Sequence, residues 1–76
     1  MNINAVLENL SNETIELSGH LISLNGLISI TLNLMPERSL AILFAPNHSG
    51  AELFFKIANE NLYFHIDVFD SRINIK

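Results

Sequence analysis

Residues 21–34 read LISLNGLISITLNL, and this stretch carries the clearest structural signal in the chain. Apolar residues recur at nearly every second position on both sides of Asn25-Gly26, as they do in β-strands with one buried face. Asn-Gly is the strongest short-range signal for a tight hairpin, because both residues tolerate a positive φ. A two-residue turn at this point pairs Leu24 with Leu27. In that register both strands direct most of their apolar side chains to one common face.

The first eleven residues have a different spacing. Ile3, Val6, Leu7 and Leu10 fall at i, i+3, i+4 and i+7, which is one stripe of an amphipathic helix. We therefore expect a short helix over residues 1–11. A helix of this length is not stable alone, so it must dock on the sheet.

After the hairpin, the sequence predicts a loop and a third strand. Residues 35–39 contain a proline, which cannot donate a hydrogen bond within a central strand. The apolar residues 40–45 follow, and Pro46 ends them. If Leu34 pairs with Leu40, this strand extends the inner face of the hairpin and completes a three-stranded meander.

Alternation with a period of two returns in the last third of the chain. Apolar residues alternate through 53–57, 62–68 and 73–75, with turn-forming residues between these segments. They predict a second three-stranded meander. Residues 51–59, AELFFKIAN, also have moderate helical character, so an α+β fold with a helix there is the alternative.

The chain of 76 residues is expected to form a single small domain, residues 1–76. The predicted class is mainly β: a small antiparallel six-stranded sandwich or barrel of two meanders over residues 14–76, with the helix at 1–11. The absence of cysteine excludes disulfides and thiolate metal sites. Hydrophobic residues make up 49% of the chain, so we expect a homo-oligomer or a partner protein to cover part of the surface.

The net charge of the chain limits the class of partner, and its N-terminal residues bear on its localisation. The formal net charge of −4 argues against tight binding to duplex DNA and is compatible with a basic protein partner. The N-terminal residues lack the basic region of a signal peptide. No apolar run approaches the about 18 residues that span a membrane. We therefore expect a cytoplasmic protein that does not bind membranes.

The outer face expected for the last three strands is the main candidate site. It combines aromatic rings, a histidine and most of the few basic residues, and its predicted binding residues are Phe54, Lys56, Tyr63, His65, Phe69 and Arg72. Aromatic residues with arginine suit an interface with another protein or with a second copy. Rings beside cations also hold single-stranded nucleic acid, which is the alternative function. A third possibility is that the N-terminal helix covers Phe54 and Phe69.

A second apolar patch is expected on the far side of the hairpin. It comprises Ile22, Leu24, Leu27 and Leu43. The N-terminal helix has a matching stripe and is expected to cover this patch.

No pattern predicts catalysis, a metal site or a cofactor. The three histidines have no compact ligand spacing, although His65 and Asp67 share one face of a strand. Nothing indicates that Glu13 and Glu16 share a pocket that would raise a carboxyl pKa. Three glycines cannot form a glycine-rich phosphate loop. We therefore expect a non-enzymatic binding module.

Overall fold

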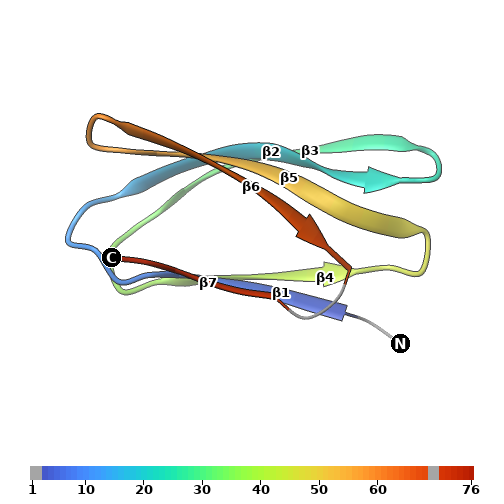
Figure 1. The fold of residues 1–76 in the computed structure, drawn as a ribbon, viewed down its shortest axis with the longest axis horizontal. Coiled ribbons are helices and arrows are strands. Elements are labelled where there is room, and N and C mark those ends of the chain that lie inside the picture. Colours follow the sequence, from blue (N-terminus) through green and yellow to red (C-terminus); the bar gives the residue numbers. More distant parts are fainter. Residues whose placement is uncertain (1–2, 69–70) are drawn as a thin grey trace.

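The computed structural model describes residues 3–68 and 71–76, and within these ranges the chain forms seven β-strands and no helix (Figure 1). One sheet has four antiparallel strands in the order β3-β2-β5-β6, and the other has three strands in the order β4-β1-β7. The two sheets stack as a sandwich. The strands are β1 (Ile3–Asn9), β2 (Ile15–Ser23), β3 (Gly26–Leu34), β4 (Ser39–Phe44), β5 (His48–Ile57), β6 (Glu60–Asp67) and β7 (Ser71–Ile75).

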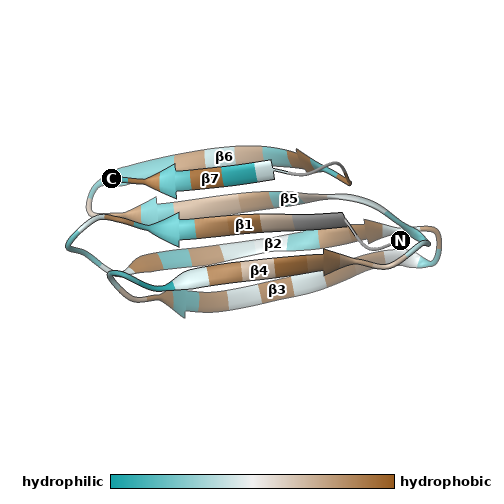
Figure 2. Ribbon diagram, turned by 90° about the horizontal axis from the view of Figure 1, so that it is seen from below, coloured by the Kyte–Doolittle hydropathy of each residue, from teal (hydrophilic) through white to brown (hydrophobic). Residues whose placement is uncertain are grey.

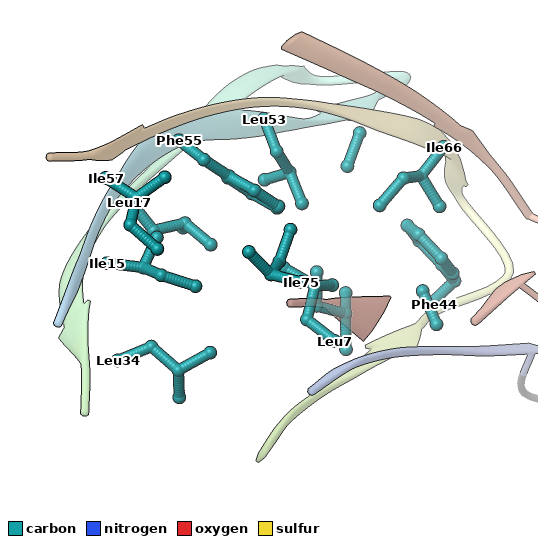
Figure 3. Close-up of a cluster of buried hydrophobic side chains, with 13 residues drawn as sticks. Leu7, Ile15, Leu17, Leu34, Phe44, Leu53, Phe55, Ile57, Ile66 and Ile75 are labelled. Atoms are coloured by element: carbon teal, nitrogen blue, oxygen red, sulfur yellow. The ribbon is translucent and has the colours of Figure 1, made fainter. Parts of the chain in front are cut away.

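The core lies between the two sheets and is built from aliphatic and aromatic side chains (Figure 3). Burial alternates along the strands, as the period of two requires. The rings of Phe55 and Phe64, on neighbouring strands, lie 5.1 Å apart. Each large apolar side chain that is fully buried contributes about 1.5–3 kcal/mol to folding. The buried apolar residues are Ala5, Leu7, Ile15, Leu17, Leu34, Ile42, Phe44, Ala51, Leu53, Phe55, Ile57, Ile66 and Ile75.

The helix predicted over residues 1–11 is wrong, because residues 3–9 form β1 at the centre of the three-stranded sheet. Ala5, Leu7 and Asn9 are buried in alternation, which is a strand pattern within the same segment. Leu10, which the helical stripe would bury, is 50% exposed. The apolar residues of this short segment fit both the helical and the strand spacing. The segment forms a strand because it pairs with β4 on one side and with β7 on the other.

The two predicted meanders are also wrong, because the chain returns to the three-stranded sheet after each hairpin. The β2–β3 and β5–β6 hairpins both belong to the four-stranded sheet, while β1, β4 and β7 form the other. Leu40 therefore lies opposite Leu7 of β1 and not opposite Leu34. β7 runs parallel to β1, so the fold is not antiparallel throughout. The described residues contain seven strands where the sequence predicts six, since β1 replaces the helix.

The first hairpin forms where the sequence predicts it, with a register shifted by two residues. Ser23 pairs with Gly26, so the bend is Leu24-Asn25 and not Asn25-Gly26. Gly26 carries the positive φ of the turn, at 120°. A shift of two residues leaves every side chain on its predicted face, because the side-chain period is also two.

The strand interpretation of residues 51–59 is confirmed, because β5 extends to Ile57 and a turn follows it. Phe55 faces the core and Phe54 faces outward, as adjacent residues of a strand must. None of the described residues belongs to a helix long and apolar enough to cross a membrane.

Candidate functional site: the outer face of the four-stranded sheet

Four of the six predicted binding residues share one face of the molecule. They lie on the face of the four-stranded sheet that points away from the core, and they are Phe54 and Lys56 of β5 and Tyr63 and His65 of β6. Arg72 does not join them, because β7 belongs to the other sheet, where Arg72 lies 3.7 Å from Glu8. Phe69 lies outside the described residues, so its predicted place on this face is not tested.

An aromatic pair forms the apolar part of this face. Phe54 and Tyr63 are directly opposite each other in the β5–β6 ladder, and their ring centroids are 5.1 Å apart at an interplanar angle of 46°. The two residues are 47% and 51% exposed. The predicted cover by a helix is absent from the described residues, so both rings are available to a ligand.

Beside the aromatic pair, the face is hollowed. Ser18 of β2 is the cross-strand neighbour of Phe54, and Thr31 of β3 is the neighbour of Ser18. These short side chains lie next to the large rings and leave a depression of about 540 Å³. Its lining residues are Glu16, Leu17, Ser18, Thr31, Leu32, Asn33, Phe54, Phe55, Lys56, Asn61, Leu62 and Tyr63. We call this depression the outer groove.

Next to the outer groove, the carboxylate of Glu52 accepts hydrogen bonds from two neighbouring side chains and forms a polar cluster with them. The Tyr63 hydroxyl donates a hydrogen bond of 2.6 Å to Oε2 of Glu52. Nε2 of His20 lies 2.9 Å from Oε1 of the same carboxylate, and because a carboxylate can only accept, Nε2 carries the proton. The hydrogen bonds from Tyr63 and from His20 hold the pKa of Glu52 below its ordinary value of 4.5. The bond to Glu52 raises the pKa of Tyr63 above 10.0.

We expect the hydrogen bond between Tyr63 and Glu52 to be measurable as a high tyrosine pKa. The chain has one tyrosine and no tryptophan, so the near-ultraviolet absorbance of tyrosinate reports on Tyr63 alone. Glu52→Ala removes both the acceptor and its negative charge and should return the pKa of Tyr63 towards 10.0. Glu16→Ala is the matched control, because Glu16 lies on the same face without a bond to Tyr63. Equal titration curves for both variants would show that the bond is not formed in solution.

The same bond has a defined dependence on pH. The pKa of Glu52 is lowered by folding, so its contribution to stability is present above pH 4.5 and is lost as pH falls through the lower folded value. The pKa of Tyr63 is raised by folding, so its contribution is present below pH 10.0 and is lost as pH rises through the higher folded value. The bond is therefore intact throughout the neutral range.

The charges on this face are few and of both signs. Glu16 and Lys56 are opposite each other in the β2–β5 ladder, and both are exposed. His65 lies 3.4 Å from Asp67 at the far end of β6. Within the part of the chain that the structure describes, no three histidine, aspartate or glutamate residues gather as they would around a metal ion.

Sequence reasoning missed Glu52 and His20 as members of this site. The period of two places each of them on an outer face, but it does not place β2 beside β5. The cluster depends on that pairing, which joins His20 to Glu52 across 32 positions of the chain. No local signal in the sequence indicates it.

The second predicted patch is divided between the two sheets, and three of its four residues are exposed. Ile22 and Leu27 are cross-strand neighbours near the tip of the first hairpin, and Leu24 in the bend is 86% exposed. Leu43 lies on β4 of the other sheet and is 60% exposed. The predicted cover by the N-terminal helix is wrong, because residues 3–9 form a strand.

Comparisons of the chain with protein-family models, with curated proteins and with solved structures found no significant match.

Proposed function

We propose that this chain is a non-enzymatic, cytoplasmic binding module that recognises a segment of another protein on the outer groove. The observation that carries the proposal is the half-exposed pair Phe54 and Tyr63 beside a ready-formed hollow. Aromatic anchors next to a concave, partly apolar surface are the features that dominate the energy of protein recognition. Here they stand on paired strands, so little ordering is needed on binding.

The chemistry of the groove favours an extended segment with apolar side chains. The hollow is bounded by rings on one side and by the short side chains of Ser18 and Thr31 on the other, and its volume of about 540 Å³ has room for more than one side chain of the partner. Serine, threonine and asparagine side chains around it can bond the backbone of an extended chain. The net charge of −4 favours a segment with basic residues near these apolar side chains.

Single-stranded nucleic acid is less well supported as the ligand. Of the basic residues expected on this face, Lys56 is there, but Glu16 is its cross-strand neighbour and Glu52 lies on the same face of β5. Arg72 belongs to the opposite sheet. Binding of single strands depends on a positively charged track along the backbone, and these positions do not form one.

The test uses Phe54 as the anchor. Peptides are selected on the protein from a random-sequence library, and a selected peptide is titrated while the fluorescence of Tyr63, the chain's one tyrosine, is followed. Phe54→Ala should weaken binding by about 30-fold, the loss expected for a hot-spot residue of about 2 kcal/mol. Leu43→Ala is the control, because Leu43 is similarly exposed on the opposite sheet and should leave the affinity unchanged.

Two results would contradict the proposal. One is a library that yields no binder, or binders that tolerate Phe54→Ala. The other is tight binding of a labelled oligonucleotide that weakens with added salt and with Lys56→Ala, which would favour the nucleic-acid alternative.

A further inference from the structure

The four edge strands of the sandwich differ sharply in charge. β3 reads GLISITLNL and β4 reads SLAILF, and neither contains a charged residue or a proline. β6 carries Glu60, His65 and Asp67, and β7 carries Arg72. The uncharged strands β3 and β4 lie along one side of the sandwich, and β6 and β7 lie along the other (Figure 2).

β3 has none of the features that normally keep an edge strand from pairing. Charged side chains, proline, bulges and short length are the usual protection of an edge. β3 is nine residues long and pairs with β2 in an unbroken register over its whole length. None of the strands in the described ranges pairs with its other edge, because β3 is the terminal strand of its sheet. Its side chains near the tip remain exposed, with Leu27 at 64% and Ile28 at 47%.

We propose that β3 pairs antiparallel with β3 of a second copy, so that two chains form one continuous eight-stranded sheet. This interface uses the backbone edge of β3, whereas the outer groove is formed by side chains on the outer face of the sheet, among them Thr31 and Asn33 of the same strand. The proposed pairing does not rest on the function proposed for the groove. The composition predicts self-association without giving its place. The proposed pairing puts it at a strand edge and not at the aromatic face.

The sequence of β3 suits pairing with itself. Around Ile30 the strand is nearly symmetric: hydroxyl residues Ser29 and Thr31 flank it, followed by the apolar residues Ile28 and Leu32. A twofold axis at Ile30 places Ser29 opposite Thr31 of the second copy, and Ile28 opposite Leu32. Such hydroxyl and apolar cross-strand pairs are favourable, and this register keeps core-facing side chains on the same face in both copies.

Charge and area both favour a second copy as the occupant. Each chain carries a net charge of −4, so two copies meet with least repulsion on the side whose strands are uncharged. The longest and intermediate dimensions of the molecule are 35 and 20 Å. The side that carries β3 and β4 spans these two dimensions, so its outline covers about 700 Å². Two copies that meet over it would bury up to about 1,400 Å² in total, which is within the range of stable interfaces.

A dimer of this kind is closed and leaves the outer groove open. The pairing uses the free edge of each β3, so the twofold symmetry does not propagate into a fibre. The groove faces away from the core, perpendicular to the strand edge, and the two grooves lie on the same face of the continuous sheet. Two linked grooves would bind a repeated or dimeric partner with higher avidity than one.

The experiment places like charges across the proposed pair. In the variant Ser29→Lys with Thr31→Lys, each lysine faces a lysine of the second copy, which is destabilising. Light scattering should give about 17 kDa, twice the chain mass of 8.5 kDa, for the wild type at high micromolar concentration, and 8.5 kDa for the variant. The control Asn61→Lys with His65→Lys adds the same number of lysines to the opposite edge strand and should stay dimeric.

A charge-swap variant separates loss of pairing from loss of folding. Ser29→Glu with Thr31→Glu should also be monomeric alone, and an equimolar mixture with the lysine variant should recover the dimer mass, because each lysine then faces a glutamate. A wild-type monomer at high concentration would overturn the proposal. So would a lysine variant that remains dimeric, or a mixture that stays monomeric while both variants are folded by circular dichroism. None of these results depends on ligand binding, so the function proposed for the groove stands or falls separately.

Discussion

Gly19→Ala should abolish the folded state or come close to it. Gly19 lies in β2 opposite Leu53 of β5, at the centre of the four-stranded sheet. A Cβ at this position would lie 2.0 Å from the backbone carbonyl oxygen of Glu52. Backbone atoms cannot rotate away as a flexible side chain can, so β2 and β5 would have to separate.

The expected cost combines this clash with backbone strain. Gly19 has a φ of 149°, a conformation that L-residues rarely adopt, and this alone costs about 1–3 kcal/mol. Overpacking adds about 1–3 kcal/mol or more when the neighbours cannot move. Small domains are stable by about 0.05–0.15 kcal/mol per residue, so the sum is comparable with the whole stability of this chain. Chemical denaturation followed by circular dichroism measures the loss.

Gly26→Ala separates the two causes. Gly26 has a φ of 120°, but a Cβ there meets no heavy atom within 4 Å. This variant should lose only the strain part, about 1–3 kcal/mol, and should remain folded. If Gly19→Ala were no less stable than Gly26→Ala, the close approach of β2 and β5 in the structure would be wrong.

The fold can be predicted from the sequence only up to the choice of which strands are neighbours. Alternation with a period of two identifies six of the strands and the face to which each side chain points, so Phe54, Tyr63 and Ile66 lie where expected. The alternation does not specify which strand is the neighbour, because any strand with the same apolar face could pair with a given edge. The sheet to which β4 and β7 belong is therefore not encoded locally, and the local pattern predicts the wrong neighbours for both.

The candidate site divides in the same way. Its aromatic pair is predictable, because Phe54 and Tyr63 are joined by a short turn whose register can be counted. The hollow beside them and the cluster at Glu52 are not, because both require β2 next to β5. Arg72 is absent from the site because β7 does not pair with β6, as the local pattern predicts, but with β1 of the other sheet.

Asn9 shows a further limit of pattern reasoning, since a buried polar residue within a strand gives no signal in the sequence. It is 0% exposed at the end of β1, and its side-chain amide uses both donors and both acceptor sites. Nδ2 donates to the carbonyl oxygens of Glu13, at 2.8 Å, and Leu34, at 2.9 Å. Oδ1 accepts from the backbone N–H and the hydroxyl of Ser11, at 3.0 and 2.6 Å. Asn9 thereby joins the end of β1, the turn before β2 and the end of β3.

Asn9→Asp is the sharpest test of this arrangement, because it keeps the shape and removes the donors. At neutral pH a carboxylate would face the carbonyl oxygens of Glu13 and Leu34 with nothing to donate, and burial would raise its pKa. We expect a loss of about 3–5 kcal/mol, the cost of an uncompensated buried charge. Asn9→Ala, which removes the four hydrogen bonds of the side-chain amide without adding a charge, should cost about 1–3 kcal/mol. Denaturation midpoints compare the two variants.

The pH dependence distinguishes charge from mere loss of packing. Because folding would raise the pKa of the carboxyl group that Asn9→Asp introduces, the destabilisation is smallest below the ordinary aspartate pKa of about 3.9 and grows as pH rises. In the protonated form the carboxyl can again donate one hydrogen bond and still accept from Ser11, so Asn9→Asp should be at least as stable as Asn9→Ala in acid. Asn12→Asp, an exposed change in the adjacent turn, is the control and should be within about 0.5 kcal/mol of the wild type. An Asn9→Asp variant as stable as Asn12→Asp at neutral pH would mean that Asn9 does not hold the two sheets together.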